Sequence, residues 1–200
     1  MTTTTAIDGK DRPRAAERIL NSARELFYRE GIRAVGVDEI VANAGVTKPS
    51  LYRSYASKDE LAASYLRLYE AEFWERFDAA VERHPGDPRA QLLDYFDVLS
   101  GRTTSPDYRG CGLSNAAVEY PDPANPARRV SEVHKAKLRE RLGEMVQAMD
   151  AAEPTLLADG LFLLLEGTLI SAQIFRNSGP SGNVAGVARL LIDAATAAKA

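Results

Sequence analysis

Residues 37–61 decide the fold, and they read VDEIVANAGVTKPSLYRSYASKDEL. They begin with a short segment that carries acidic residues in its first turn, where they complement a helix dipole, and that ends at Gly45. Thr47 stands at the cap position of a second short segment, and Pro49 lies in its first turn. Two short helices joined by about three residues that include a glycine are typical of a helix-turn-helix, so the sequence predicts one here.

A longer helix is predicted on each side of this pair. Before it, apolar residues recur over 16–27 at the three-and-four spacing of one helical face, with Pro13 placed to open the helix and Gly31 to end it. After it, residues 57–60 (SKDE) form a capping box that opens a long helix, and residues 84–86 (HPG) end that helix.

The rest of the chain has helical periodicity as well. Further helices are predicted to start at Asp87, to span about 111–119, to run up to about Asp150, to start at Pro154 and to start at Asn183, with a loop over 101–110. No segment shows the sustained alternation of a β-strand. The sequence therefore predicts an all-α fold of about nine helices.

Composition and charge narrow the class of protein. With 200 residues and 45% hydrophobic content the chain can bury a core, and its single cysteine, Cys111, excludes an intrachain disulfide. The N-terminus has no apolar leader and the longest strongly apolar run, 161–165, is too short to cross a bilayer, so we expect a cytoplasmic protein. Residues 1–58 hold ten Lys and Arg against seven Asp and Glu, a charge of +3. Because the net charge of the whole chain is −3, the remaining residues carry −6. A basic head on an acidic body suits contact with phosphate at one end.

The sequence argues against an enzyme. His84 falls in a predicted loop and His134 on what reads as a charged helix face. There is no HExxH, no paired Cys or His ligands and no glycine-rich phosphate loop. We therefore expect no catalytic residues, no metal and no cofactor.

The stretch from Ile19 to Leu61 resembles the DNA-binding domain of the TetR family of bacterial repressors. The resemblance is carried by residues 23–27 (ARELF), Gly31, 37–46 and 47–61. It implies a recognition helix at about 48–55 that lies in the major groove, with the first helix bracing it. The implied organisation is a disordered tail (1–12), a helix-turn-helix domain (13–57) and a ligand-binding and dimerisation domain (58–200). Gly36 and Pro49 depart from residues that are common in the family, which predicts a less firmly anchored second helix.

Physical chemistry supports the same roles for the recognition helix. Hydroxyl groups near a helix N-terminus, together with backbone N–H groups, can bind phosphate oxygens, and a lysine can donate to guanine in the major groove. Lys48 is the candidate for a base contact, and Tyr52, Tyr55 and Lys58 for the backbone. Tyr55 as a core residue and Arg53 as a solvated one remain open alternatives. The predicted DNA-binding residues are Thr47, Lys48, Pro49, Ser50, Tyr52, Arg53, Tyr55 and Lys58.

For residues 58–200 the resemblance implies a ligand cavity, and a homodimer formed by the last two helices. Small residues among leucines and isoleucines there permit close helix approach, and a helix that is apolar on nearly all sides must be buried by something. Residues 109–119 also resemble a segment found in a subset of the family. The cavity candidates are Trp74, Tyr95, Phe96, Tyr108, Cys111, Asn115, Glu119, Phe162, Glu166 and Gln173.

Each cavity candidate also has a plainer interpretation. Aromatic residues with a few polar groups suit a small-molecule pocket and an ordinary core equally well. Glu166 can instead be an acid at a dimer rim or in solvent, and Cys111 a buried inert thiol instead of an oxidant sensor. The sequence thus predicts a ligand-responsive regulator, a repressor released from a palindromic operator by a small molecule. The alternative is a constitutive DNA-binding factor without a ligand.

Overall fold

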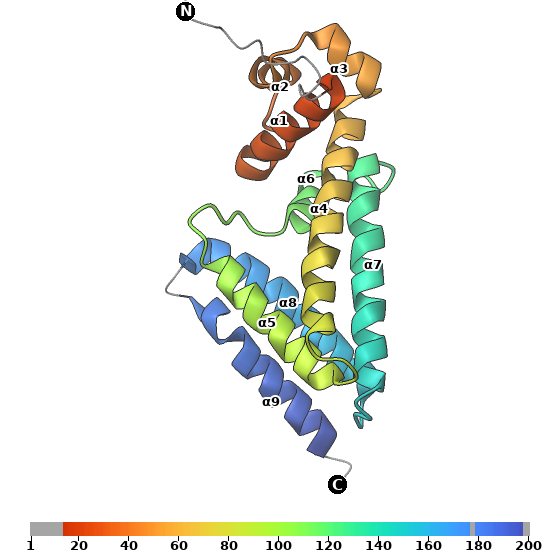
Figure 1. The fold of residues 1–200 in the computed structure, drawn as a ribbon, viewed down its shortest axis with the longest axis vertical. Coiled ribbons are helices and arrows are strands. Elements are labelled where there is room, and N and C mark those ends of the chain that lie inside the picture. Colours follow the sequence, from red (N-terminus) through yellow and green to blue (C-terminus); the bar gives the residue numbers. More distant parts are fainter. Residues whose placement is uncertain (1–13, 177–178, 198–200) are drawn as a thin grey trace, which may run out of the picture.

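The computed structural model describes residues 14–176 and 179–197, and this part of the chain has helices joined by loops and no β-strand, which confirms the predicted all-α class (Figure 1). The predicted tail (1–12) lies outside the described residues. Within these described ranges nine α-helices follow one another, and a short 3-10 helix at Pro180–Asn183 precedes the last. They are α1 (Ala15–Glu30), α2 (Val37–Ala44), α3 (Lys48–Ser54), α4 (Lys58–Glu82), α5 (Pro88–Thr103), α6 (Gly112–Glu119), α7 (Pro126–Gln147), α8 (Pro154–Phe175) and α9 (Val184–Ala197).

Helices α1–α3 form a head at one end of α4, and α4–α9 form a larger body (Figure 1). Gly36 precedes α2 without a side-chain cap, so α2 depends on α1 for its anchors. The Arg18 guanidinium donates to the carbonyl of Ala44 at 3.3 Å, and Ser22 Oγ donates to the carbonyl of Ile40 at 3.0 Å. These bonds fix α2 against α1 although its N-terminus lacks a capping side chain.

Helix α4 connects the head to the body. Ser57 Oγ accepts a hydrogen bond from the Glu60 N–H at 3.1 Å, which confirms the predicted start of the helix. Farther along, Phe73 and Phe77 of α4 lie in the body core. The same rigid helix therefore begins directly after α3 and ends inside the body.

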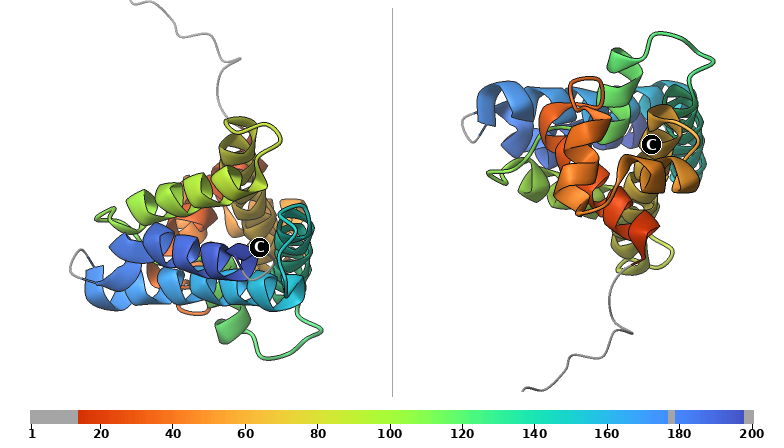
Figure 2. Two further views of the ribbon diagram at one scale, coloured as in Figure 1. Left: turned by 90° about the horizontal axis from the view of Figure 1, so that it is seen from below. Right: turned by 90° about the horizontal axis from the view of Figure 1, so that it is seen from above.

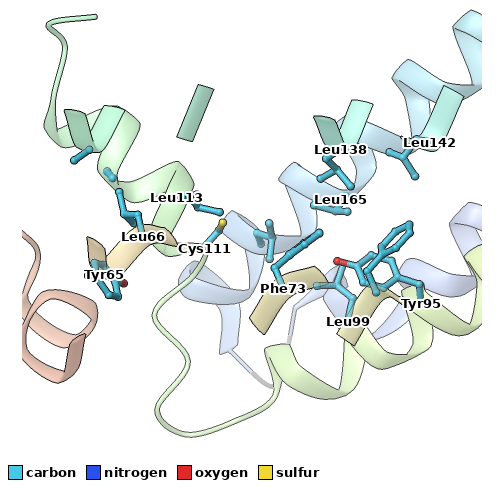
Figure 3. Packing of buried hydrophobic residues seen from close by; sticks show 14 of the residues in the cluster. Tyr65, Leu66, Phe73, Tyr95, Leu99, Cys111, Leu113, Leu138, Leu142 and Leu165 are labelled. Carbon is cyan, nitrogen blue, oxygen red and sulfur yellow. The ribbon is translucent and has the colours of Figure 1, made fainter. Parts of the chain in front are cut away.

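In the body, α4 packs against α5 and α7, α7 packs against α8, and α9 packs against α5 and α8. Seen from below, α9 lies between α5 and α8 (Figure 2). Figure 3 shows the core residues that join them: Phe73 from α4 meets Tyr95 and Leu99 from α5, and Leu138 from α7 meets Leu165 from α8. Leu113 of α6 and Cys111, which directly precedes α6, extend this core toward the head.

Two details of the body differ from the sequence predictions. The loop predicted over 101–110 starts later, because α5 continues through Gly101 to Thr103. Gly101 has open space around it and a helical conformation, so nothing forces it to end the helix. His134, expected on a charged face, is fully buried, because it falls between Ser131 and Leu138 on the inner stripe of α7.

Helix α8 carries more exposed apolar surface than a monomeric core helix should. Within the described residues it is the one helix whose length and hydropathy, 1.5 averaged over 18 residues, would suit a membrane span, whereas the sequence prediction named no such segment. Only 39% of that window is buried. The exposed large apolar residues of α8 and α9 are Leu156, Leu163, Ile170, Ile174, Phe175, Val187, Leu190 and Leu191.

Two glycines provide a matched test of this fold. Gly110 has φ +83°, and a Cβ placed on it would collide with the Gln173 carboxamide, whereas Gly143 is helical with open space around it. We expect Gly110→Ala to lower the free energy of unfolding by about 1–3 kcal/mol and Gly143→Ala to raise it by about 0.5–1 kcal/mol. Urea unfolding at one protein concentration measures both. Equal effects of the two substitutions would refute the conformation assigned to the chain at Gly110.

Candidate functional site

Helix α3, the predicted recognition helix, presents a hydroxyl-rich and cationic surface. Thr47 stands at the cap position as predicted, but its hydroxyl lies 3.1 Å from Ser50 Oγ and does not cap the backbone. The Arg53 guanidinium donates to the same Ser50 oxygen at 2.7 Å. Leu51 is fully buried beneath this surface, as predicted. The face of α3 opposite to Leu51 is therefore free for a ligand with acceptor oxygens.

Lys48 is held at the surface by an ion pair. Its Nζ lies 2.9 Å from Asp38 Oδ1 on α2, and the side chains are 49% and 83% exposed. The hydrogen bond to Asp38 and the charge of that carboxylate raise the pKa of Lys48. A bound base or phosphate must compete with Asp38 for this ammonium group.

Three further residues that are predicted to contact DNA differ in how far their side chains are buried. Tyr52 is 49% exposed on α3. The Tyr55 hydroxyl donates to the carbonyl of Ala16 at 3.1 Å, and partial burial raises its pKa. Lys58 Nζ donates to the carbonyl of Arg33 at 3.4 Å, and burial lowers its pKa. Tyr55 thus ties the end of α3 to α1, and Lys58 ties the start of α4 to the segment between α1 and α2. Tyr52 faces outward, and Thr47, Lys48, Pro49 and Arg53 are exposed as well.

The predicted cavity residues of the body are not gathered around one cavity. Tyr108 and Gln173 line a cavity of about 330 Å³ between the ends of α5 and α8. Trp74 borders a separate pocket of about 370 Å³, where Lys137 Nζ lies 4.5 Å above its ring. Tyr95, Phe96 and Cys111 are buried in the core, and Phe162 packs against it.

The remaining polar candidates are engaged with protein groups. The Glu166 carboxylate pairs with Lys135 at 2.5 Å and accepts from Ser114 Oγ at 2.9 Å. Asn115 donates to the carbonyl of Arg109 at 2.9 Å. These bonds tie α6 to α7, α8 and the segment before it.

His134 is a buried polar residue that the sequence interpretation missed. It is fully buried, with its ring 4.6 Å from that of Phe73 and 5.5 Å from that of Trp74, centroid to centroid. Burial first, and then the charges of Lys135 and Lys137, lower its pKa to about 3. The imidazole is therefore neutral at physiological pH. Its three-and-four spacing with Ser131 and Leu138 was the available signal.

Besides packing α1 against α4, the head contacts the body through α6 and the segment before it. The carbonyl of Gly110 accepts from the Tyr28 hydroxyl of α1 at 3.2 Å and from the Tyr69 hydroxyl of α4 at 3.3 Å. The Glu119 carboxylate accepts from the Arg33 N–H at 2.7 Å, so this predicted cavity residue bonds to the head. Both contacts lie close to the C-terminal end of α1 and fix its direction.

Comparison with known proteins identifies the family to which this architecture belongs. Residues 19–65 match the family model described as "Bacterial regulatory proteins, tetR family". Over nearly its whole length the chain is similar to a solved structure from Streptomyces avermitilis ascribed to the TetR regulators. The identity is 32%, the TM-score 0.79, and the match covers 92% of this chain and 98% of that one. This chain belongs to the TetR family.

Other TetR-family proteins resemble it over a similar extent. A transcriptional regulator of this family from Streptomyces coelicolor is 28% identical with a TM-score of 0.85, covering 91% of this chain and 96% of that one. The transcriptional repressor ComR of Escherichia coli is 26% identical over 177 residues, 82% of this chain and 83% of ComR. This TetR-family chain is accordingly a transcriptional regulator and not an enzyme, from a family whose members bind DNA as dimers.

The ion pair between Lys48 and Asp38 gives a test of the DNA surface. Asp38→Asn frees Lys48 and removes a negative charge beside it. We expect tighter binding to mixed-sequence duplex DNA and a log–log salt slope steeper by about one, and a slope shallower by about one for Lys48→Ala. Fluorescence anisotropy at several salt concentrations measures the slope. Asp97→Asn makes the same charge change at an exposed site on α5 and should have no effect. An effect of Asp97→Asn as large as that of Asp38→Asn would contradict a local role.

Proposed function

We propose that this chain is a cytoplasmic repressor that binds a pseudo-palindromic operator as a homodimer and leaves it when a small molecule binds the body. The role of repressor is supported by the similarity to ComR, which is named as one. The DNA-binding role is supported by the exposed hydroxyl and cationic surface of α3.

The observation that carries the homodimer is the apolar face of α8 and α9. Leu156, Leu163 and Ile170 are spaced by seven residues, so they form one stripe along α8, and they are 71%, 67% and 52% exposed. Leu190 of α9 is 71% exposed as well. No neighbouring atom lies within 4 Å of a Cβ built on Gly160, Gly167 or Gly186, so another helix can approach closely there. A second copy of the same face, packed as a four-helix interface, would bury this surface.

Two recognition helices related by a twofold axis favour an operator with matching symmetry. Half-sites for such dimers lie about one helical turn apart or farther, because each helix needs its own stretch of major groove. The carboxyl end of α3 leads directly into α4, so the direction of α4 in each subunit sets the spacing of the two heads.

Release by a ligand requires that the ligand bind one arrangement of the heads better than the other. Helix α4 and the bonds of Gly110 and Glu119 connect the body to α1 and α3, and they are the routes along which a bound molecule would act. A typical coupling of about 1–3 kcal/mol would lower operator affinity by roughly 5–150-fold. The alternative, a constitutive DNA-binding factor, predicts an operator affinity that no small molecule changes.

Binding to a pseudo-palindromic operator is tested by selecting the DNA sequences that the protein binds from a random duplex library. The protein is then footprinted on the selected sequences. We expect a pseudo-palindrome protected over both halves. Protection of a single, non-repeated site would refute the proposal. The alternative of a constitutive factor is tested on the same operator with a library of small molecules, since release by any of them excludes it.

The dimer face is tested by Leu190→Glu, which places a charge in the proposed interface. We expect the variant to sediment as a monomer and to lose about 100-fold or more in operator affinity, because one head must then bind without its mate. Val118→Glu makes the same change on α6, where Val118 is 84% exposed and belongs to neither α8 nor α9. A monomer from Val118→Glu, or a dimer from Leu190→Glu, would exclude the α8 and α9 face as the interface.

A further inference from the structure

The cavity of about 330 Å³ at the ends of α5 and α8 has a positively charged opening. Two of the residues that line it, Arg109 and Arg176, are exposed arginines, and none of its described lining residues is an aspartate or a glutamate. The pocket beside Trp74 differs in this respect, because Glu140 and Glu144 border it. Two cations without an acid beside them attract an anion to the cavity at the ends of α5 and α8.

The interior of this cavity suits a small polar molecule. Thr103 and Ala172 are each only 2% exposed and form its floor, and the half-buried Tyr108 and Gln173 form its walls. The Thr103 hydroxyl donates to a backbone carbonyl of α5 at 2.7 Å, and the Tyr108 hydroxyl donates to one of α8 at 3.2 Å. Both hydroxyl oxygens therefore keep lone pairs that can accept a hydrogen bond, and the Gln173 carboxamide can both donate and accept.

The Arg109 side chain can bind an anion in this cavity. Its Nε donates to the carbonyl of Arg29 on α1 at 3.1 Å. Its other two guanidinium nitrogens have neither a hydrogen-bond acceptor nor an ion-pair partner among the described residues. A carboxylate is a stronger acceptor for a guanidinium group than a neutral carbonyl is, because both partners of the bond are then charged.

We propose that this cavity binds a small hydroxy acid and that this acid is the effector. Arg109 and Arg176 hold its carboxylate at the opening, and Thr103 and Gln173 bind its hydroxyl groups inside. The planar fork of a guanidinium group matches a carboxylate with two parallel hydrogen bonds. A volume of about 330 Å³ lies at the lower end of the range for ligand pockets, which limits the acid to a short carbon skeleton. This inference rests on the proposed release by a ligand and gives that ligand a site and a chemical class.

The position of Arg109 links this cavity to the head. The segment that joins α5 to α6 passes between the end of α8 and α1 (Figure 1), so Pro106 and Arg109 line this cavity and also a groove of about 580 Å³ against α1. On the α1 side, Arg109 Nε donates to the Arg29 carbonyl, and the Arg109 backbone N–H donates to the Tyr28 hydroxyl at 3.0 Å. A carboxylate that draws the guanidinium group into the cavity competes with the Arg29 carbonyl. The acid thereby weakens the hold of this segment on α1.

The site is tested by calorimetric titration of the full-length protein, without DNA, with malate, citrate and gluconate and with the corresponding amides. We expect at least one acid to bind and its amide to bind about tenfold more weakly or worse. Arg109→Gln and Arg176→Gln should each weaken the acid by about 10- to 100-fold. Arg67→Gln removes an exposed arginine of α4 that does not line this cavity, and it should leave the affinity unchanged.

A second variant separates binding inside the cavity from attraction to charge at the surface. Ala172→Leu fills part of the floor and keeps both arginines, so we expect it to weaken the acid by about tenfold or more. Binding to Ala172→Leu as tight as to the parent protein would place the acid outside the cavity and refute the site.

Three further results would overturn the assignment: amides that bind as well as acids, no binding by any of the three acids, or binding of inorganic phosphate in their place. Titration in the presence of operator separates the two proposals. An acid that binds without releasing DNA supports the site and refutes ligand-controlled release. Release by neutral molecules alone supports ligand control and refutes the carboxylate site.

Discussion

The carbonyl of Gly110 is the acceptor on which the arrangement of head and body depends. Two tyrosine hydroxyls from different helices donate to it, Tyr28 from α1 and Tyr69 from α4. The carbonyl reaches both because the backbone at Gly110 has φ +83° and packs tightly against Gln173, a combination that suits only glycine. The direction of α1, and with it the position of the recognition helix, therefore follows from one turn in the middle of the chain.

The contacts around this acceptor differ in how firmly they are made. Within the head, buried apolar residues and the bonds from Arg18 and Ser22 hold α2 to α1 as a unit. Between head and body, the ring of Phe27 on α1 packs against that of Tyr65 on α4, 5.9 Å between centroids, and both side chains are buried. The bonds of Tyr28 and Glu119 are polar and less buried. Such polar bonds open at lower cost than a buried apolar contact, so they are the part of the attachment that can change while α1 stays packed on α4.

Much of the fold follows from local signals, and much of the site does not. The cap at Ser57, the glycine stop at Gly45 and the helical periodicities depend on neighbouring residues, so the sequence predicted the helix-turn-helix and the all-α class. The bond between Tyr28 and Gly110 joins residues 82 positions apart, and no periodicity announces it. His134 was misjudged because its charged neighbours Lys135 and Lys137 masked its place on the inner stripe of α7. The cavity candidates rest on residue type, and residue type does not show which side chains border the same cavity, so Tyr108 and Trp74 border separate ones.

The most direct test is the distance between the two copies of α3 in the proposed dimer without DNA, measured by double electron–electron resonance. Spin labels are placed with Arg53→Cys in a Cys111→Ser background, because Arg53 is exposed and Cys111 is the one native thiol. The account predicts one narrow distance distribution for this protein and a clearly broader one after Tyr28→Phe and Tyr69→Phe, with helix content unchanged. Equal distributions with and without the two hydroxyls would contradict the claim that the Gly110 carbonyl fixes the head.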